Sequence, residues 1–142
     1  MVEIVLDTET LRLIVLFERT TGARVKDCLD QDGRQVFVVE DGDLGKALGR
    51  GAVNLKKLRD VLNREVEIVG FSQDREQFVK NLFHRFELES IAFDERNDGT
   101  VSARVKVKAD DKGKAIGKGG RNIGLARMLA QRHHQLADVQ IE

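Results

Sequence analysis

The stretch "KAIGKGGRN" at residues 114–122 contains three glycines and three cationic side chains within nine positions. Glycine loses more conformational freedom on folding than any other residue, so a cluster of glycines marks backbone that turns sharply or is approached closely. The stretch therefore indicates one of three features. These are a phosphate loop for a nucleotide, a contact with a nucleic-acid strand, or a close corner between two helices.

The same stretch occurs a second time, 68 positions earlier, as "KALGRGAVN" at residues 46–54. With this offset, nine of the 22 positions from Asp43 to Arg64 are identical to their counterparts. Chance would leave about one or two identities over this length, so the chain contains a duplicated unit. We expect two domains, residues 1–70 and 71–142, that sit against each other because only a very short connection separates them.

Both copies share one order of predicted elements. Hydrophobic periodicity and turn residues predict a helix, a β-hairpin, two helices flanking the glycine stretch, and a final strand. This α-β-β-α-α-β order indicates an α+β fold. The predicted elements of the first copy are a helix at 8–20, a hairpin at 24–39, helices at 43–48 and 54–62 and a strand at 65–69; those of the second are a helix capped by Ser72 or Asp74, strands at 87–95 and 101–108, helices ending at 116 and spanning 122–133, and a strand at 137–141.

Charge is balanced over the whole chain but uneven along it. The 24 basic and 24 acidic residues give a net charge of zero, so the overall charge does not indicate a nucleic-acid-binding protein. Residues 43–64, however, carry six cations against two anions, and residues 104–132 carry nine against two. The first ten residues lack the features of a signal peptide, and the longest apolar run, 13–17, is too short to span a membrane. We expect a soluble, cytoplasmic protein that binds its ligand locally.

A nucleotide-binding enzyme is the weakest of the three hypotheses. A phosphate loop needs Ser or Thr directly after its lysine to hold magnesium, and it joins a strand to a helix. Here Ala follows Lys114 and Lys46, Gly follows Lys118, and the stretch joins two predicted helices. We therefore expect no catalytic activity and no cofactor.

A close helix corner explains the glycines but leaves the cations unexplained. Arg50 and Lys118 stand inside the two glycine frames, where a corner has no need of charge. A clamp for a single nucleic-acid strand accounts for both features. Absent side chains let the sugar-phosphate backbone lie against the peptide, and amides at the next helix N-terminus favour phosphate. Cations within the loop add attraction.

The Gly-x-x-Gly frame, its β-α-α-β surroundings and its duplication resemble KH domains, in which such a loop clamps single-stranded RNA. The helix and strand that precede the core are similar to the type II arrangement, which implies small mixed three-stranded sheets packed by helices. More narrowly, "DDKGKAIGKGGRNIGLARMLA" at residues 110–130 resembles the tandem KH region of NusA-type transcription factors, as does the stretch 47–83 across the junction.

This resemblance implies a single-stranded RNA-binding protein of transcription elongation, termination or antitermination, with RNA polymerase as a candidate partner. Bacterial members also carry a polymerase-binding N-terminal domain and an S1 domain, for which 142 residues leave no room, so the chain resembles the short archaeal form. The alternative is a KH-type protein of ribosome assembly or structure. Ribosomal proteins usually carry a large positive charge, which is absent here.

The RNA-binding residues that the motif implies lie in and beside the two loops. Ala52 stands where the second copy has Gly120; if this position adopts a positive φ, alanine is disfavoured by about 1 kcal/mol, and the second loop is the stronger site. The predicted contacts are Lys114, Ile116, Gly117, Lys118, Gly119, Gly120, Arg121 and Asn122 in the second copy and Lys46, Leu48, Gly49, Arg50, Gly51, Ala52 and Asn54 in the first.

Three further features have ordinary structural explanations beside functional ones. Bases could rest on aliphatic side chains near the loops, but each of these residues could equally belong to the core. The adjacent His133 and His134 point in different directions on a helix, so we expect no metal site. Cys28, in a predicted strand, is expected to be a small buried group and not a nucleophile. The aliphatic candidates are Ile116, Ile123, Val107, Leu48, Leu55 and Val38.

Overall fold

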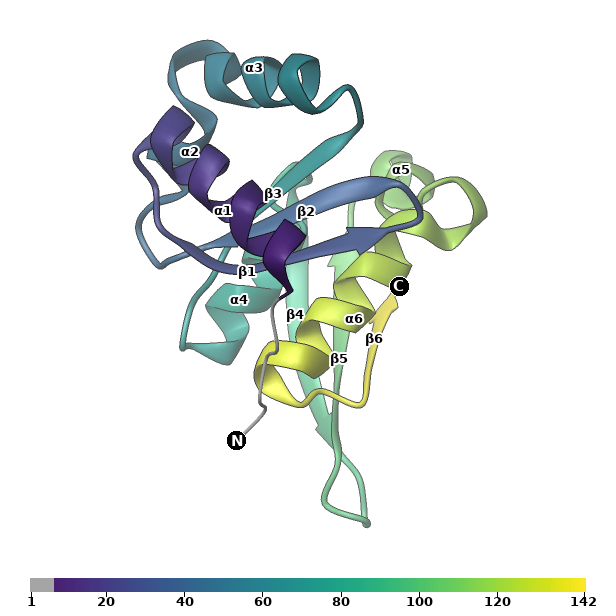
Figure 1. The fold of residues 1–142 in the computed structure, drawn as a ribbon. Helices are drawn as coiled ribbons and strands as arrows, with labels where there is room; N and C mark the ends of the chain where they lie inside the picture. Colours follow the sequence, from purple (N-terminus) through teal and green to yellow (C-terminus); the bar gives the residue numbers. More distant parts are fainter. Residues whose placement is uncertain (1–6) are drawn as a thin grey trace. The chain divides into compact units, whose positions relative to one another are not determined.

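The computed structural model describes residues 7–142, which form two compact units, one ending at Gln73 and the other spanning Asp74–Glu142. The expected first domain begins at residue 1, and its residues 1–6 lie outside the described part of the chain. Each unit has the predicted α-β-β-α-α-β order (Figure 1). A short 3₁₀ turn lies inside each glycine stretch. Among residues 7–142, no helix is long and apolar enough to cross a membrane.

The first unit begins with helix α1 (Thr8–Thr21), whose N-cap Asp7 accepts a hydrogen bond from the Thr10 amide. A two-residue turn at Asp32-Gly33 then joins the strands of the hairpin. The remaining elements are β1 (Val25–Gln31), β2 (Arg34–Val39), α2 (Leu44–Leu48), the 3₁₀ turn η1 (Arg50–Ala52), α3 (Val53–Leu62) and β3 (Val66–Gly70).

The sheet of the first unit is mixed, in the order β1-β2-β3. Strand β2 pairs with β1 in antiparallel and with β3 in parallel register. The helices cover one of its faces, where Phe17 of α1 stacks on Phe37 of β2 with ring centroids 4.3 Å apart. Ala47 of α2 and Leu58 of α3 are buried in the same cluster. This cluster holds the two helices that flank the first glycine loop against the sheet.

The second unit repeats this architecture. Asp74, and not Ser72, caps its first helix by accepting a hydrogen bond from the Gln77 amide. Its sheet has the order β4-β5-β6, antiparallel and then parallel. The elements are α4 (Arg75–Leu82), β4 (Leu88–Glu95), β5 (Val101–Val107), η2 (Ala109–Asp111), α5 (Lys112–Ile116), η3 (Lys118–Gly120), α6 (Arg121–His134) and β6 (Asp138–Ile141).

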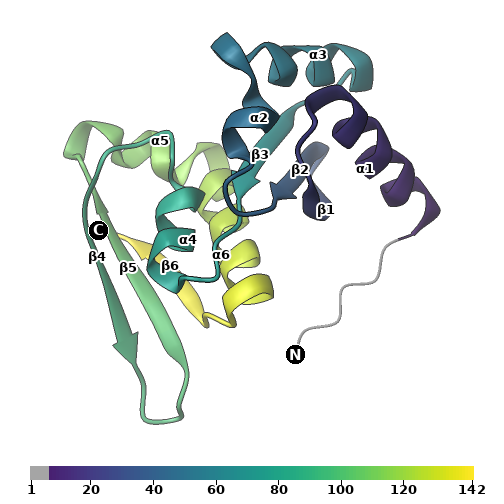
Figure 2. The same cartoon turned by 90° about the vertical axis from the view of Figure 1, so that its left-hand side faces the viewer.

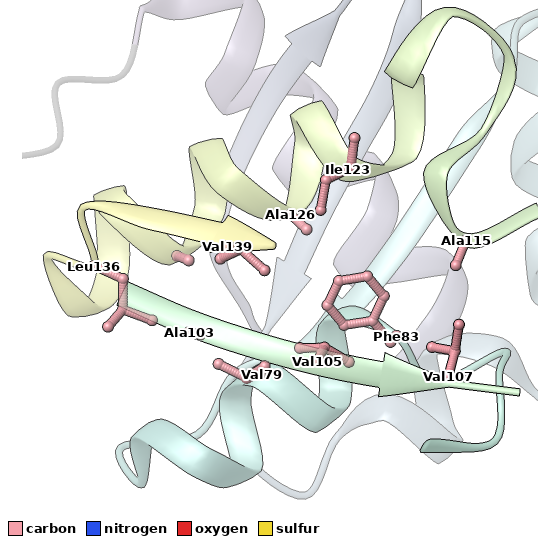
Figure 3. Packing of buried hydrophobic residues seen from close by; sticks show 11 residues of the cluster. Val79, Phe83, Ala103, Val105, Val107, Ala115, Ile123, Ala126, Leu136 and Val139 are labelled. Atoms are coloured by element: carbon pink, nitrogen blue, oxygen red, sulfur yellow. The ribbon is translucent and has the colours of Figure 1, made fainter. Parts of the chain in front are cut away.

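Helices α4, α5 and α6 cover one face of the second sheet, as Figure 2 and Figure 3 show. Val105 of β5 is fully buried there, together with Val79 of α4 and Ala115 of α5. Ile123 of α6 points toward the same cluster (Figure 3). The core therefore anchors the helix on each side of the second glycine loop, as it does in the first unit.

Candidate nucleic-acid interface

The two glycine loops have the same backbone conformation. Gly49 and Gly117, the first residues of the frames, have φ/ψ of 73°/172° and 81°/164°. The third residues, Gly51 and Gly119, lie at 64°/25° and 65°/19°. The stretches 46–54 and 114–122, which differ at four of their nine positions, thus fold into one shape, because the flanking helices are held in the same way in both units.

The first glycine of each frame is required by its conformation and by its surroundings. A Cβ atom on Gly117 would lie 2.9 Å from the backbone nitrogen and 3.0 Å from Cγ of Asn122. A Cβ on Gly49 would lie 2.8 Å from Nδ2 of Asn54. This φ/ψ region is essentially restricted to glycine. The helix therefore ends at Gly49 and Gly117 because no other residue fits there.

The fourth position of the frame adopts a left-handed conformation in both loops. Gly120 has φ 76°, and Ala52 has φ 58°. Residue 52 therefore has the positive φ on which the prediction for Ala52 depended, and alanine occupies a strained conformation in the first loop. These residues also set the helix boundaries, because α3 begins at Val53 and α6 at Arg121, each one residue before the predicted start.

Four cationic side chains that the sequence predicts as RNA contacts are exposed. Two lie in the glycine loops and two in the helices that precede them: Arg50, Lys118, Lys46 and Lys114. Within residues 7–142, none of them pairs with a carboxylate. Two lysines at the end of strand β5 and directly after it behave differently. Lys106 pairs with Glu89 at 3.8 Å, and Lys108 pairs with Glu87 at 2.7 Å. The loop cations are thus available to an anionic ligand, whereas Lys106 and Lys108 each already face a carboxylate.

The aliphatic candidates separate into core residues and surface residues. Val107 is 3% exposed, Ile123 6% and Val38 0%, so these three are buried side chains and do not offer a surface to a base. Ile116, Leu48 and Leu55 are partly exposed and pack against the edges of the two cores. Only these three remain as candidates for contact with a base beside the loops.

The side chains of Asn54 and Asn122 hydrogen-bond within the loops. Each Nδ2 atom donates at 2.9 Å to the carbonyl oxygen of Lys46 or Lys114, respectively. The sequence predicts both asparagines as RNA contacts and does not predict this structural bond. The signal that could have revealed it is their identity at equivalent positions in two copies that differ around them.

His133, His134 and Cys28 take part in contacts within the fold. His133 and His134 both lie against the Phe78 ring, at centroid distances of 5.7 and 5.1 Å. Cys28 is buried and accepts a hydrogen bond from Gln35 Nε2 at 3.0 Å. Burial raises the pKa of its thiol to about 11, so the reactive thiolate is scarce at neutral pH. Among the described residues, no group of three or more His, Cys, Asp or Glu side chains could hold a metal ion.

Comparison with known proteins places these loops in a family. A model of the NusA-like second KH domain matches residues 75–141. A probable transcription termination protein NusA of Halobacterium salinarum is 39% identical over 136 residues, covering 96% of this chain and 96% of the relative. One of Methanococcus vannielii is 36% identical over 137 residues, covering 96% of this chain and 78% of the relative.

A solved structure agrees with these relatives. The crystal structure of APE1850 superposes with a TM-score of 0.77 at 40% sequence identity, and the match covers 96% of this chain and all of that one. The mixed three-stranded sheets and the paired glycine loops are thus those of tandem KH-like domains. The chain belongs to the NusA family.

Proposed function

We propose that this protein binds single-stranded RNA at its two glycine loops and acts in transcription elongation, termination or antitermination. The observation that carries the proposal is the pair of loops with one backbone conformation, each with an exposed cation at its tip, Arg50 and Lys118, that pairs with no carboxylate of the described chain. Relatives described as probable transcription termination proteins support the cellular process.

The chemistry of each loop suits a phosphodiester backbone. A Cβ on Gly51 or Gly119 would meet no described atom within 4 Å, so the tip is open to a ligand. Helices α3 and α6 begin directly after the loops, and the partial positive charge of a helix N-terminus favours phosphate. The partly exposed Leu48 and Ile116 end the preceding helices and offer an apolar surface to a base.

The second loop is proposed as the stronger site. Its fourth residue is Gly120, whereas the first loop holds Ala52 in a strained left-handed conformation. The first residue of the following helix is Arg121 in the second unit and Val53 in the first, where it is 43% exposed. The second loop therefore has one more cation and a less constrained backbone.

Binding alone is the proposed activity, without a chemical step. RNA polymerase is the candidate protein partner, because the relatives belong to transcription. The test is to purify the protein from cells and to ask whether RNA polymerase or ribosomal subunits copurify with it.

The test replaces the loop tip of each copy by two aspartates, as Lys118→Asp with Gly119→Asp and as Arg50→Asp with Gly51→Asp. The carboxylates repel phosphate, and aspartate is among the residues that tolerate a positive φ. We expect the second-loop variant to lose at least about tenfold in affinity for single-stranded RNA of random sequence, roughly 1.4 kcal/mol. The first-loop variant should lose less.

The controls are thermal melting of both variants and binding to a duplex RNA. Both variants should unfold cooperatively near the wild-type temperature, and wild-type protein should prefer the single strand to the duplex. Stable variants that bind RNA as well as wild type would show that the glycines serve helix packing alone. A larger loss from the first-loop variant would reverse the ranking of the two sites.

A further inference from the structure

A side-chain hydrogen bond joins the two helices that flank each glycine loop. Asn122 is the second residue of α6, and its Nδ2 atom donates to the carbonyl oxygen of Lys114, in the last turn of α5. Asn54 of α3 makes the equivalent bond to Lys46 of α2, also at 2.9 Å. The bond spans eight residues in both units and leaves the loop tip between its ends.

The acceptor carbonyl is one that the helix itself leaves without a donor. The Gly117 amide donates to the Gly113 carbonyl at 2.9 Å and so closes the last regular turn of α5. In a continuing helix the next bonds would reach Lys114 from Lys118. The chain leaves the helix at Gly117, so that donor is lost. The side-chain amide of Asn122 takes the place of this donor. The bond is therefore a form of C-terminal capping by a side chain outside the helix.

The first glycine of the frame and the asparagine are fitted to each other. The Cβ atom that Gly117 lacks would lie within 3.0 Å of both Cγ and Nδ2 of Asn122. Around the tip residue Gly119 the situation is opposite, because a Cβ there would meet none of the described atoms within 4 Å. The asparagine thus holds the ends of the loop tightly and leaves its middle open.

We propose that Asn54 and Asn122 are positioning residues, which hold the two helix ends together so that the loop is shaped for phosphate before RNA arrives. This inference rests on the proposed RNA binding at the loops. The bond is the same in both units although the residues around it differ, with Arg50 and Ala52 in one loop and Lys118 and Gly120 in the other. The bond therefore supports the shape of the loop and does not determine which RNA the loop prefers. Preorganisation of this kind raises affinity by reducing the ordering that binding requires.

The experiment compares Asn122→Ala with Lys118→Ala in the full chain. Loop order without RNA is measured by ¹⁵N relaxation of the Lys118 and Gly119 amides, and binding is measured with single-stranded RNA of random sequence over a series of salt concentrations. Asn122→Ala should make the free loop mobile and lower affinity about tenfold, with an unchanged salt slope. Lys118→Ala should leave the free loop ordered and reduce the salt slope by about one phosphate contact.

Asn54→Ala is the matched variant, and it should mobilise only the first loop. The inference is overturned if Asn122→Ala leaves the free loop ordered, or if the loop becomes mobile while RNA affinity stays at the wild-type value. Failure of wild-type protein to bind RNA would instead contradict the proposed function, and the relaxation measurements would still report whether the asparagine orders the loop.

Discussion

At the scale of single residues, the two copies differ most informatively at one backbone position. Ala52 and Gly120 both lie in the left-handed region, at φ 58° and 76°. Among the described residues, the nearest atom to a Cβ on Gly120 would be Ile123 Cγ2, at 3.8 Å. Alanine at this position is therefore disfavoured by its own backbone conformation and not by crowding.

This difference predicts opposite effects for two reciprocal substitutions. Ala52→Gly should raise the free energy of unfolding by about 0.5–1 kcal/mol, because the strain of a left-handed alanine is larger than the entropy that glycine loses. Gly120→Ala should lower it by about the same amount. Chemical denaturation of the full chain is the measurement. As a control, Ala47→Gly in the buried part of α2 should lower the free energy of unfolding. If Ala52→Gly also lowered it, the argument from backbone strain would be wrong.

At the scale of elements, the proposed unit of recognition is a short helix, a loop and a long helix. Helices α2 and α5 have five residues each, too few to be stable alone, and the buried Ala47 and Ala115 hold them to their cores. The asparagine bond then ties each short helix to the long one that follows. Because these supports are equal in the two units, the loops between them should be interchangeable.

A loop exchange tests this equivalence. Replacing Arg50-Gly51-Ala52-Val53 by Lys-Gly-Gly-Arg gives the first unit the loop of the second. In a chain whose second loop carries Lys118→Asp and Gly119→Asp, we expect RNA affinity to rise at least about threefold, since the strain is relieved and a cation is added. The reciprocal exchange, which places Arg-Gly-Ala-Val at residues 118–121 in a chain with a disabled first loop, should lower it. No change in either direction would mean that features outside the loops set the affinity.

At the scale of the whole molecule, the two proposed RNA sites lie on one chain with a short connection between the units. Strand β3 ends at Gly70 and α4 begins at Arg75. The next residue after β3, Phe71, remains anchored in the first unit, because its amide donates to the Val39 carbonyl at 2.8 Å and Lys26 lies over its ring. A connection this short gives the second binding event on one RNA strand a high effective concentration.

A length series of unstructured RNA measures that linkage. Affinity should step upward by about tenfold or more once a strand is long enough to reach both loops, without any new contact. The chain carrying Arg50→Asp and Gly51→Asp is the control and should show no step. A flat series in the wild-type chain would show that the two units bind separately, or that one of them does not bind.

Much of this arrangement follows from local sequence. The 68-residue duplication, the order of elements and the glycine loops are visible in the chain because turn residues and hydrophobic periodicity act over a few residues. The strand and helix boundaries differ by one residue at several ends. The helices that follow the loops begin one residue earlier than predicted, because Ala52 and Gly120 are the left-handed residues directly before the first helical turn.

Other features depend on contacts between parts that are distant in sequence. The sequence could not separate Val107 and Ile123, which are buried, from Ile116, which is partly exposed, because burial depends on how the helices lie on the sheet. Nor could it show that Asn122 reaches the Lys114 carbonyl, since that bond requires the helix to break at Gly117 and the next helix to return beside it. The sequence by itself determined where the glycine loops lie and how often they occur, while the tertiary structure decided which side chains shape each loop and which stay exposed beside it.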